Sequence, residues 1–401
     1  MAILSISGLS RSFGQNTLFE NVSFLIDESD KVGLIGANGA GKTTLFRLLT
    51  GEDTPDSGSL IRSGSCSIGY MEQYLRESYG KTVYEEALTA FEHLEKIEQE
   101  LSKIADMIDK GLDTGEIIVR QHTLQEKYEN EGGLLYKSRT RAVLLGLGFS
   151  EEDLLLSCEV LSGGQKTRLS LARLLLSDAD FLLLDEPTNH LDMDAIAYLE
   201  DYLISYKGAF IVISHDRYFL DKVTLRTFEL ENRHLTIFEG NYSKYMSYKE
   251  TDCEIRQRHY ENDMKEIKRI EGIIEQQRRW NREKNIKTAE SKQKMLDKKI
   301  AGLDKPESLD DKVRMTFSPA RESGYDVLKL IDIKKSFDGV TLFEHTNADI
   351  KKGEKVFFIG GNGTGKTTLL KIIMQRLSYD CGEIIRGAKV DAGYYEQQSS
   401  D

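Results

Sequence analysis

Short apolar runs alternate with amphipathic stretches over the first 240 residues of the chain. The apolar runs end at charged residues or glycine, as expected of strands that are buried on both faces of a parallel sheet. The amphipathic stretches carry apolar residues at helical spacing. Strands are predicted at KVGLIG (31–36), DFLLLDE (180–186) and AFIVISHD (209–216), and helices at TTLFRLLTG (43–51) and KTRLSLARLLLSD (166–178). This alternation predicts an α/β fold.

Two longer segments lack predicted strands. Residues 82–130 are rich in Glu, Lys, Leu and Ile and contain no proline, which predicts a helical insertion over about residues 82–135. Residues 244–305 carry apolar side chains at helical spacing, and the polar stretch RRWNREKN (278–285) interrupts them. We therefore expect two helices that form an antiparallel hairpin, with the turn near residues 280–285.

The chain also contains an internal repeat. TLFE occurs at 17–20 and again at 341–344, and the same shift sets Lys42 on Lys366 and Gln73 on Gln397 without insertion or deletion. An in-register match of this length indicates a duplicated module. The second copy has no counterpart of residues 78–240, so we expect it to be partial.

Phosphate chemistry is indicated first by the stretch GANGAGKT. Its spacing of two glycines followed by lysine and threonine, between a predicted strand and a predicted helix, fits a P-loop. Glycines let backbone N–H groups close around phosphates at the positive end of a helix, the lysine neutralises phosphate charge, and the threonine hydroxyl ligates Mg²⁺. The candidate nucleotide-binding residues are Gly36, Ala37, Asn38, Gly39, Ala40, Gly41, Lys42, Thr43 and Thr44.

The second copy repeats this P-loop in register. An ordinary glycine-rich turn is the alternative for one such match, but two matches at the repeat spacing favour a phosphate-binding loop. The corresponding candidates are Gly360, Gly361, Asn362, Gly363, Thr364, Gly365, Lys366, Thr367 and Thr368.

The stretch FLLLDEPTNHLD (181–192) supplies two carboxylates for the same chemistry. An apolar strand would deliver Asp185 to the carboxyl edge of the sheet, where it can hold Mg²⁺ through water. Glu186 could then orient and deprotonate an attacking water molecule. An acidic turn that starts a helix is the structural alternative.

Four motifs in this order, namely GYMEQ (69–73), LSGGQ (161–165), DEPTNHLD (185–192) and ISHD (213–216), resemble the ATP-binding cassette family. The resemblance covers residues 1 to about 240. It implies two cassettes packed head to tail, with ATP between the P-loop of one and the signature motif of the other. The signature residues are Leu161, Ser162, Gly163, Gly164 and Gln165.

The same resemblance assigns further residues. Gln73 would link Mg²⁺ and water to movement of the cassettes, His215 would contact the γ-phosphate as a third catalytic residue beside Glu186, and Asp192 would cross the interface between cassettes. Phe13 and Phe337 would stack on adenine, with a place in the core as the alternative. The implied ligands of Mg²⁺ are Thr43, Gln73, Asp185, Thr367 and Gln397.

Within this family the chain resembles the ABC-F proteins, which are ATPases that act on the ribosome. EGNYSKY (239–245), AESKQKML (289–296) and the insertion after Gln73 carry this resemblance. It implies a first cassette at 1–240 with a helical arm, a linker at 241–322 and part of a second cassette at 323–401. The linker tip would lie near the peptidyl-transferase centre, so rRNA and P-site tRNA are the expected partners.

The charge of the linker partly supports this expectation. Nine Lys or Arg residues stand against three Asp or Glu residues between positions 278 and 299, in a chain whose net charge is −12. Local basicity in an acidic protein favours a surface that faces nucleic-acid phosphates, and a solvated coiled-coil face is the alternative. The candidate RNA contacts are Arg278, Arg279, Trp280, Arg282 and Lys284.

Composition narrows the classes of protein to which the chain could belong. The chain has no apolar run of about 20 residues, so we expect no membrane contact. Its first residues lack a basic, then apolar leader, and its four cysteines lack metal-binding spacing, so we expect a cytoplasmic protein with reduced thiols. Two functional alternatives stay open: the ATPase subunit of an ABC transporter, and an ABC-F protein that protects ribosomes from antibiotics. Self-association through the cassettes is a further expectation for this form.

Overall fold

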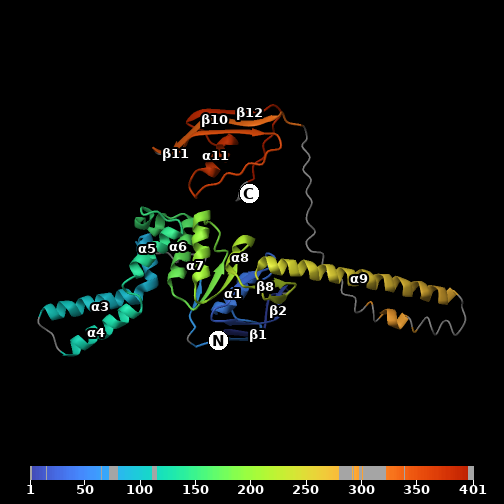
Figure 1. Cartoon of the computed structure of the whole chain (residues 1–401), viewed down its shortest axis with the longest axis horizontal. Helices are drawn as coiled ribbons and strands as arrows, with labels where there is room; N and C mark the ends of the chain where they lie inside the picture. Colours follow the sequence, from blue (N-terminus) through green and yellow to red (C-terminus); the bar gives the residue numbers. More distant parts are fainter. Residues whose placement is uncertain are drawn as a thin grey trace.

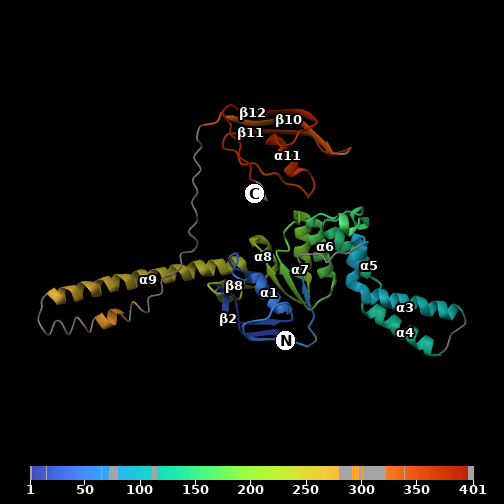
Figure 2. The same cartoon turned by 180° about the vertical axis from the view of Figure 1, so that it is seen from behind.

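The computed structural model describes residues 2–14, 16–64, 66–71, 80–110, 115–279, 291, 293–297, 300, 322–337 and 339–395. In these ranges the first copy of the repeat forms an α/β unit, from which two long helical elements extend in opposite directions (Figure 1). Figure 2 shows the same arrangement from behind. No helix within the described ranges is both long enough and apolar enough to cross a membrane.

A six-stranded sheet forms the centre of the first copy, in the order β5-β6-β7-β3-β8-β9. Its strands are β3 (Lys31–Ile35), β5 (Ile68–Tyr70), β6 (Phe181–Asp185), β7 (Ala209–Ile213), β8 (Arg226–Glu231) and β9 (His234–Phe238). Strands β5, β6, β7, β3 and β8 run parallel, and β9 pairs antiparallel with β8 at one edge. The predicted parallel sheet is thus a mixed one. The additional strand arises because the short Asn232–Arg233 turn, with positive φ at both residues, reverses the chain after β8.

Each face of this sheet packs into its own core. Alternate residues of β6 point to opposite faces, so Leu182 and Leu184 join one cluster whereas Phe181 and Leu183 join the other. The first cluster includes residues of α6 (Gly163–Leu176), α7 (Met193–Ser205) and α8 (Arg217–Val223). The second includes residues of α1 (Lys42–Thr50) and of a three-stranded antiparallel sheet, β2-β1-β4. These last strands are β1 (Ala2–Phe13), β2 (Asn16–Asp27) and β4 (Ser57–Arg62).

Helices occupy the region where a helical insertion is predicted. They are α2 (Val83–Leu88), α3 (Glu92–Asp109) and α4 (Gly115–Asn130), with a short 3₁₀ turn at η1 (Thr89–Phe91). Beyond the predicted bounds follow α5 (Tyr136–Gly146) and the 3₁₀ turns η2 (Asp153–Leu155) and η3 (Cys158–Val160). Helices α3 and α4 lie side by side and project from the α/β unit (Figures 1 and 2). The capping box of Thr82 and Glu85 fixes the start of the insertion, because each side chain accepts from the backbone N–H of the other residue.

The predicted linker begins with one long helix, α9 (Tyr242–Arg279). Ile267 and Ile274 of α9 are buried in a small cluster with Leu296, which lies on the return segment. Apolar residues from two segments therefore pack together, as a helical hairpin requires. The predicted turn at residues 280–285 lies outside the described residues.

The second copy forms a smaller unit. A three-stranded antiparallel sheet, β11-β10-β12, contains β10 (Asp326–Phe337), β11 (Val340–Lys351) and β12 (Cys381–Arg386), and it packs on α11 (Lys366–Ile373). Residues 355–359, the repeat of β3, do not form a strand. This difference has a physical reason: β3 pairs with β7 and β8, and the second copy contains no counterparts of these strands.

Candidate nucleotide-binding site

The first P-loop lies between β3 and α1. Gly41 precedes the helix with a φ of 102°, in the left-handed region that favours glycine. Gly36 passes so close to β8 that a Cβ atom there would lie 2.3 Å from the backbone oxygen of Leu230. Two of the glycines in the motif are therefore required by geometry, and the N–H groups at the start of α1 are left for an anion.

Lys42 folds back over this loop. Its Nζ atom donates to the backbone oxygens of Gly36, at 2.7 Å, and Ala37, at 3.0 Å. Burial lowers the pKa of Lys42, and the nearby carboxylates of Glu186 and Asp185 oppose that shift. Phosphate oxygens entering the loop would give the ammonium charge-assisted partners and offset its loss of hydration.

Oxygen ligands suited to a divalent cation converge beside the lysine. Asp185 ends β6, and its Oδ2 atom accepts a hydrogen bond of 2.8 Å from the hydroxyl of Thr43 in α1. A hydroxyl and a carboxylate oxygen in contact match the hard ligands that Mg²⁺ takes, together with water and phosphate. The residues present therefore fit the predicted cation, with Thr43 and Asp185 as its protein ligands.

Glu186 follows Asp185 and adopts a φ of 50°, which is uncommon for a residue with a side chain. Its backbone N–H donates to the oxygen of Ile213 at 2.9 Å, and its Oε2 atom accepts from the backbone N–H of His215 at 3.3 Å. Its Oε1 atom is buried, lies 3.5 Å from Nε2 of His215, and forms no hydrogen bond with the described residues. Burial raises the pKa of this carboxyl.

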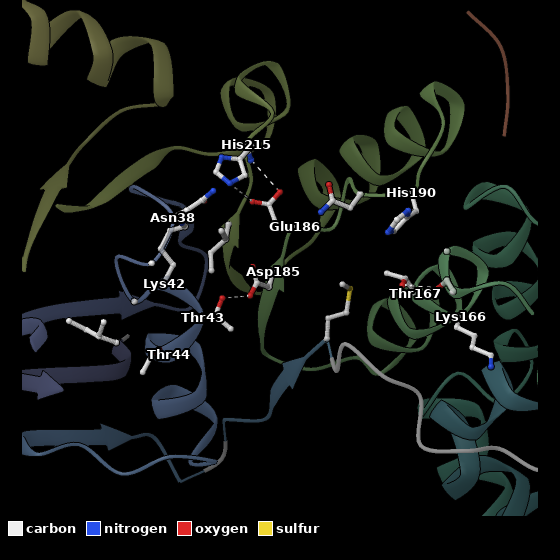
Figure 3. A pocket seen from close by; sticks show the side chains of 18 of the residues that line it. Asn38, Lys42, Thr43, Thr44, Lys166, Thr167, Asp185, Glu186, His190 and His215 are labelled. Atoms are coloured by element: carbon white, nitrogen blue, oxygen red, sulfur yellow. Dashed lines mark hydrogen bonds and ion pairs between the residues drawn. The ribbon is translucent and has the colours of Figure 1, made fainter. Parts of the chain in front are cut away.

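These groups surround one cavity of about 1210 Å³ (Figure 3). The P-loop, the two carboxylates and His215 line one part of it, and residues of the signature motif line another. In Figure 3, Lys42, Thr43, Asp185 and Glu186 lie next to one another, with His215 above them and Lys166 and Thr167 across the cavity. The volume is somewhat above the usual range for pockets that hold small-molecule ligands or cofactors.

The signature motif begins α6. Ser162 caps the helix by accepting from the backbone N–H of Gln165, and the side chain of Gln165 accepts from the backbone N–H of Ser162 in return. The helix therefore starts at Gly163, three residues before the predicted stretch, because the capping box fixes its first turn. Gly163 and Gly164 line the cavity, and Leu161 is buried in the first core cluster.

The second P-loop has the same local geometry as the first. Gly365 precedes α11 with a φ of 92°, and Nζ of Lys366 donates to the backbone oxygens of Gly360 and Gly361 at 2.7 and 2.6 Å. This loop touches the first copy, because the side chain of Asn362 donates to the backbone oxygen of His190 at 2.9 Å. Asp192, the predicted interface residue, caps α7 through its Oδ1 atom.

Gln73, Gln397, Trp280, Arg282 and Lys284 lie outside the described residues. Arg278 and Arg279 are the last two residues of α9, and their side chains also lie outside the description.

The cavity includes residues that the sequence prediction missed. They are Leu18, Met71, Lys166, Thr167, Asn189, His190 and Ile213. Asn189 and His190 belong to the quoted motif DEPTNHLD, and Lys166 and Thr167 follow the signature motif directly. Their position next to motif residues was the available signal.

Fold and site together define a P-loop ATPase domain: the parallel strands of the mixed sheet deliver a phosphate loop, the carboxylate of Asp185 and the adjacent Glu186 to one cavity. The profile of the family described as "ABC transporter" matches residues 19–189 and 343–401, and a second profile with the same description matches 228–317. The chain belongs to the ABC transporter family, and its relatives include members of the F branch.

Three relatives illustrate the similarity. YdiF of Bacillus subtilis is 36% identical over the full length of the chain, which spans 62% of YdiF. YfmM of Bacillus subtilis, an ABC transporter ATP-binding protein by description, is 34% identical over 99% of the chain and 76% of its own length. ABC transporter F family member 5 of Arabidopsis thaliana is 33% identical over 99% of the chain and 58% of its own length.

Proposed function

We propose that the protein is an ABC-F ATPase that binds and hydrolyses Mg-ATP between two cassettes and acts on the ribosome during translation. Glu186 carries the hydrolytic part of this proposal. Its buried Oε1 atom has no hydrogen-bond partner among the described residues, and it lies in the cavity beside the P-loop. A general base requires a carboxylate oxygen of this kind, free to accept a proton from water.

The residues would divide the reaction as follows. Lys42 and the P-loop N–H groups would hold the phosphates. Thr43 and Asp185 would hold Mg²⁺, which would supply positive charge to the phosphate oxygens. Glu186 accepts a proton from water as the water oxygen attacks the γ-phosphorus. The bond from that phosphorus to the bridging oxygen breaks, and ADP and phosphate are released.

The head-to-tail arrangement is supported by the approach of the second P-loop to the first cassette. Asn362 contacts His190, and a Cβ atom on Gly164 of the signature motif would lie 3.3 Å from Cβ of that histidine. The second P-loop would therefore share its nucleotide with the signature motif of the first cassette. The first P-loop would need a second signature motif, which the 401 residues do not contain.

Sharing of each nucleotide site between two cassettes can be tested by dilution. In a polypeptide limited to residues 1–401, first cassettes would complete their sites only by pairing between molecules, so its phosphate release per molecule should rise with protein concentration. A longer form that includes the rest of the second cassette should hydrolyse ATP at a rate per molecule that does not change on dilution. Equal, concentration-independent rates for both forms would contradict shared sites.

The ribosomal part of the proposal rests on the F-branch relatives and on the basic stretch of the linker. The linker would reach towards the peptidyl-transferase centre and contact rRNA and P-site tRNA. Replacing Arg278, Arg279, Arg282 and Lys284 with glutamine should weaken co-sedimentation with ribosomes. It should also reduce the dependence of binding on salt, because binding releases counterions from each phosphate that the protein contacts, and the variant contacts fewer phosphates.

A matched control replaces four exposed basic residues elsewhere, Arg62, Lys103, Lys110 and Lys127, with glutamine. Both variants lose the same charge, so only contacts at the linker tip separate them. Equal co-sedimentation of the two variants at every salt concentration would favour a solvated helix face.

A further inference from the structure

An arginine lies against the aromatic ring that is predicted to stack on adenine. Phe13, the last residue of β1, lines the cavity and is 53% exposed. The guanidinium carbon of Arg11 lies 5.0 Å from the centre of the Phe13 ring. One face of the ring is therefore covered by a cation, and the exposed remainder is left for a planar base.

Arg11 is itself held by two carboxylates. Its Nη2 atom donates to both oxygens of Asp53, at 2.8 and 2.9 Å, and its Nη1 atom donates to Asp56 at 3.0 Å. Asp56 also accepts from the backbone N–H of Ser12, between the arginine and the ring, at 2.7 Å. These three hydrogen bonds to two carboxylates give the guanidinium group a fixed plane and a fixed position.

This network joins the ring to the helix that carries the P-loop. Asp53 follows Gly51, the residue that ends α1, and its backbone N–H donates to the oxygen of Arg47 in the same helix. Base platform and phosphate loop thus belong to different elements, β1 and α1, and Arg11 connects them. A nucleotide must meet both at a fixed separation to bind well.

The second copy repeats the arrangement with different residues. Nζ of Lys335 lies 5.0 Å from the centre of the Phe337 ring and 3.2 Å from Oδ1 of Asp380. Asp380 also accepts from the backbone N–H of Ser336. The repeat places Leu377 where the first copy has Asp53, so the link to the P-loop helix is absent there. A cation behind the ring is common to both copies, and the second carboxylate belongs to the first copy alone.

We propose that Arg11 is a positioning residue for the nucleotide base at the first site. It acts through Phe13, because it fixes the position of the ring and leaves the exposed part of the ring to contact the base. It also sets the distance from Phe13 to the P-loop. Lys335 has the weaker, unlinked form of this role at the second site. The inference rests on the proposed binding of ATP.

The test compares two ligands, ATP and inorganic tripolyphosphate, which share phosphates but not the base. It uses the full chain carrying Lys366→Ala, so that the first P-loop is the intact one, and isothermal titration calorimetry in the presence of Mg²⁺. Arg11→Met should weaken ATP binding about fivefold, the size expected from loss of a cation–ring contact and of positioning. Tripolyphosphate affinity should stay within about twofold, and Arg11→Lys should restore most of the ATP affinity.

Arg62→Met is the matched control, because Arg62 is an exposed arginine of the same antiparallel sheet, on β4. Arg11→Gln keeps a donor for Asp53 and replaces the methionine variant if that variant fails to fold. Equal loss of ATP and tripolyphosphate affinity would overturn the inference, since Arg11 would then act on the P-loop helix alone. Unchanged ATP affinity in Arg11→Met would also overturn it. Failure of the parent to bind ATP at all would overturn the proposed function as well.

Discussion

The two copies of the repeat place nearly the same sequence in different environments. KVGLIG in the first copy forms the central strand β3, and Val32 and Leu34 are fully buried. KVFFIG in the second copy forms no strand, and Val356 and Phe357 are 50% and 83% exposed. Whether such a segment forms a buried parallel strand therefore depends on neighbouring elements, because its hydrogen bonds and both of its faces need partners from elsewhere in the chain.

The P-loops that follow these segments nevertheless agree. Gly41 and Gly365 have similar left-handed φ values, and each lysine closes over the first oxygen of its loop at 2.7 Å. A loop that wraps its own backbone depends on local rules, namely glycine where φ is positive and a helix start for the orphan N–H groups. The described residues of the second copy thus form a phosphate cradle that does not depend on a neighbouring parallel sheet.

The largest expected effect concerns Glu186 of the first copy. Glu186→Gln should lower the rate of phosphate release by about 10²- to 10⁴-fold, because the amide cannot accept the proton of water. ATP binding should survive, since Lys42, Thr43 and Asp185 are unchanged. Phosphate release and calorimetry on the same samples measure the two quantities.

Glu250→Gln provides the control for this change, because Glu250 is an exposed residue of α9 far along the chain from the motif. Wild-type turnover in Glu186→Gln would show that the protein uses another base. Loss of ATP affinity in the same variant would show that Glu186 holds the nucleotide instead of activating water.

The next effect compares the two P-loops directly. Lys42→Ala and Lys366→Ala should each weaken one site, with a loss of affinity of about tenfold to a hundredfold for that site, as expected for hydrogen bonds to charged groups. Calorimetric titration of each single variant and of the double variant with Mg-ATP would count the sites. A wild-type titration curve for Lys366→Ala would mean that the second loop does not bind nucleotide, despite its geometry.

A smaller effect tests the burial of the two related segments. Val32→Ala should lower the free energy of unfolding by about 2 kcal/mol, since a buried side chain loses two methyl groups and leaves a cavity. Val356→Ala should change it by less than about 0.5 kcal/mol, as for other exposed positions. The two variants make the same chemical change at equivalent positions of the repeat, and urea unfolding followed by circular dichroism compares them. Equal losses would mean that residues 355–359 are covered in solution.

Local signals explain which features could be predicted from the sequence. The P-loops, the end of α1 at Gly51 and the position of Asp185 at the edge of the sheet each depend on a few adjacent residues. The start of α6 was predicted three residues late, although Ser162 and Gln165 form a capping box that the sequence contains.

Non-local contacts explain the rest. The pairing of β9 with β8, the missing strand at residues 355–359 and the contact from Asn362 to His190 all depend on residues distant in sequence. The proposed role of Arg11 could not be predicted from the sequence either, because Asp53 and Asp56 approach it only once β1 lies beside the end of α1. Sequence spacing predicts where the chemistry lies, whereas the groups that hold its side chains in place come from folding.

The smallest effect is a pH dependence that belongs to the first copy alone. Burial raises the pKa of Glu186 in the folded protein above the value for an unfolded chain. Protonation therefore favours the fold, and this contribution is complete below the unfolded pKa and is lost as the pH rises through the folded pKa. Glu186→Gln does not ionise, so its stability relative to the wild type should increase with pH across this window and stay constant above it. Urea unfolding of both proteins at a series of pH values from acid to neutral measures the difference.

The rate of phosphate release by the wild type should fall as the pH falls through the same window, because the base must be ionised to accept a proton. A stability difference that does not vary with pH would show that Glu186 is as well solvated as an ordinary carboxylate, and burial would then give no reason to expect a pH-sensitive base at the first site.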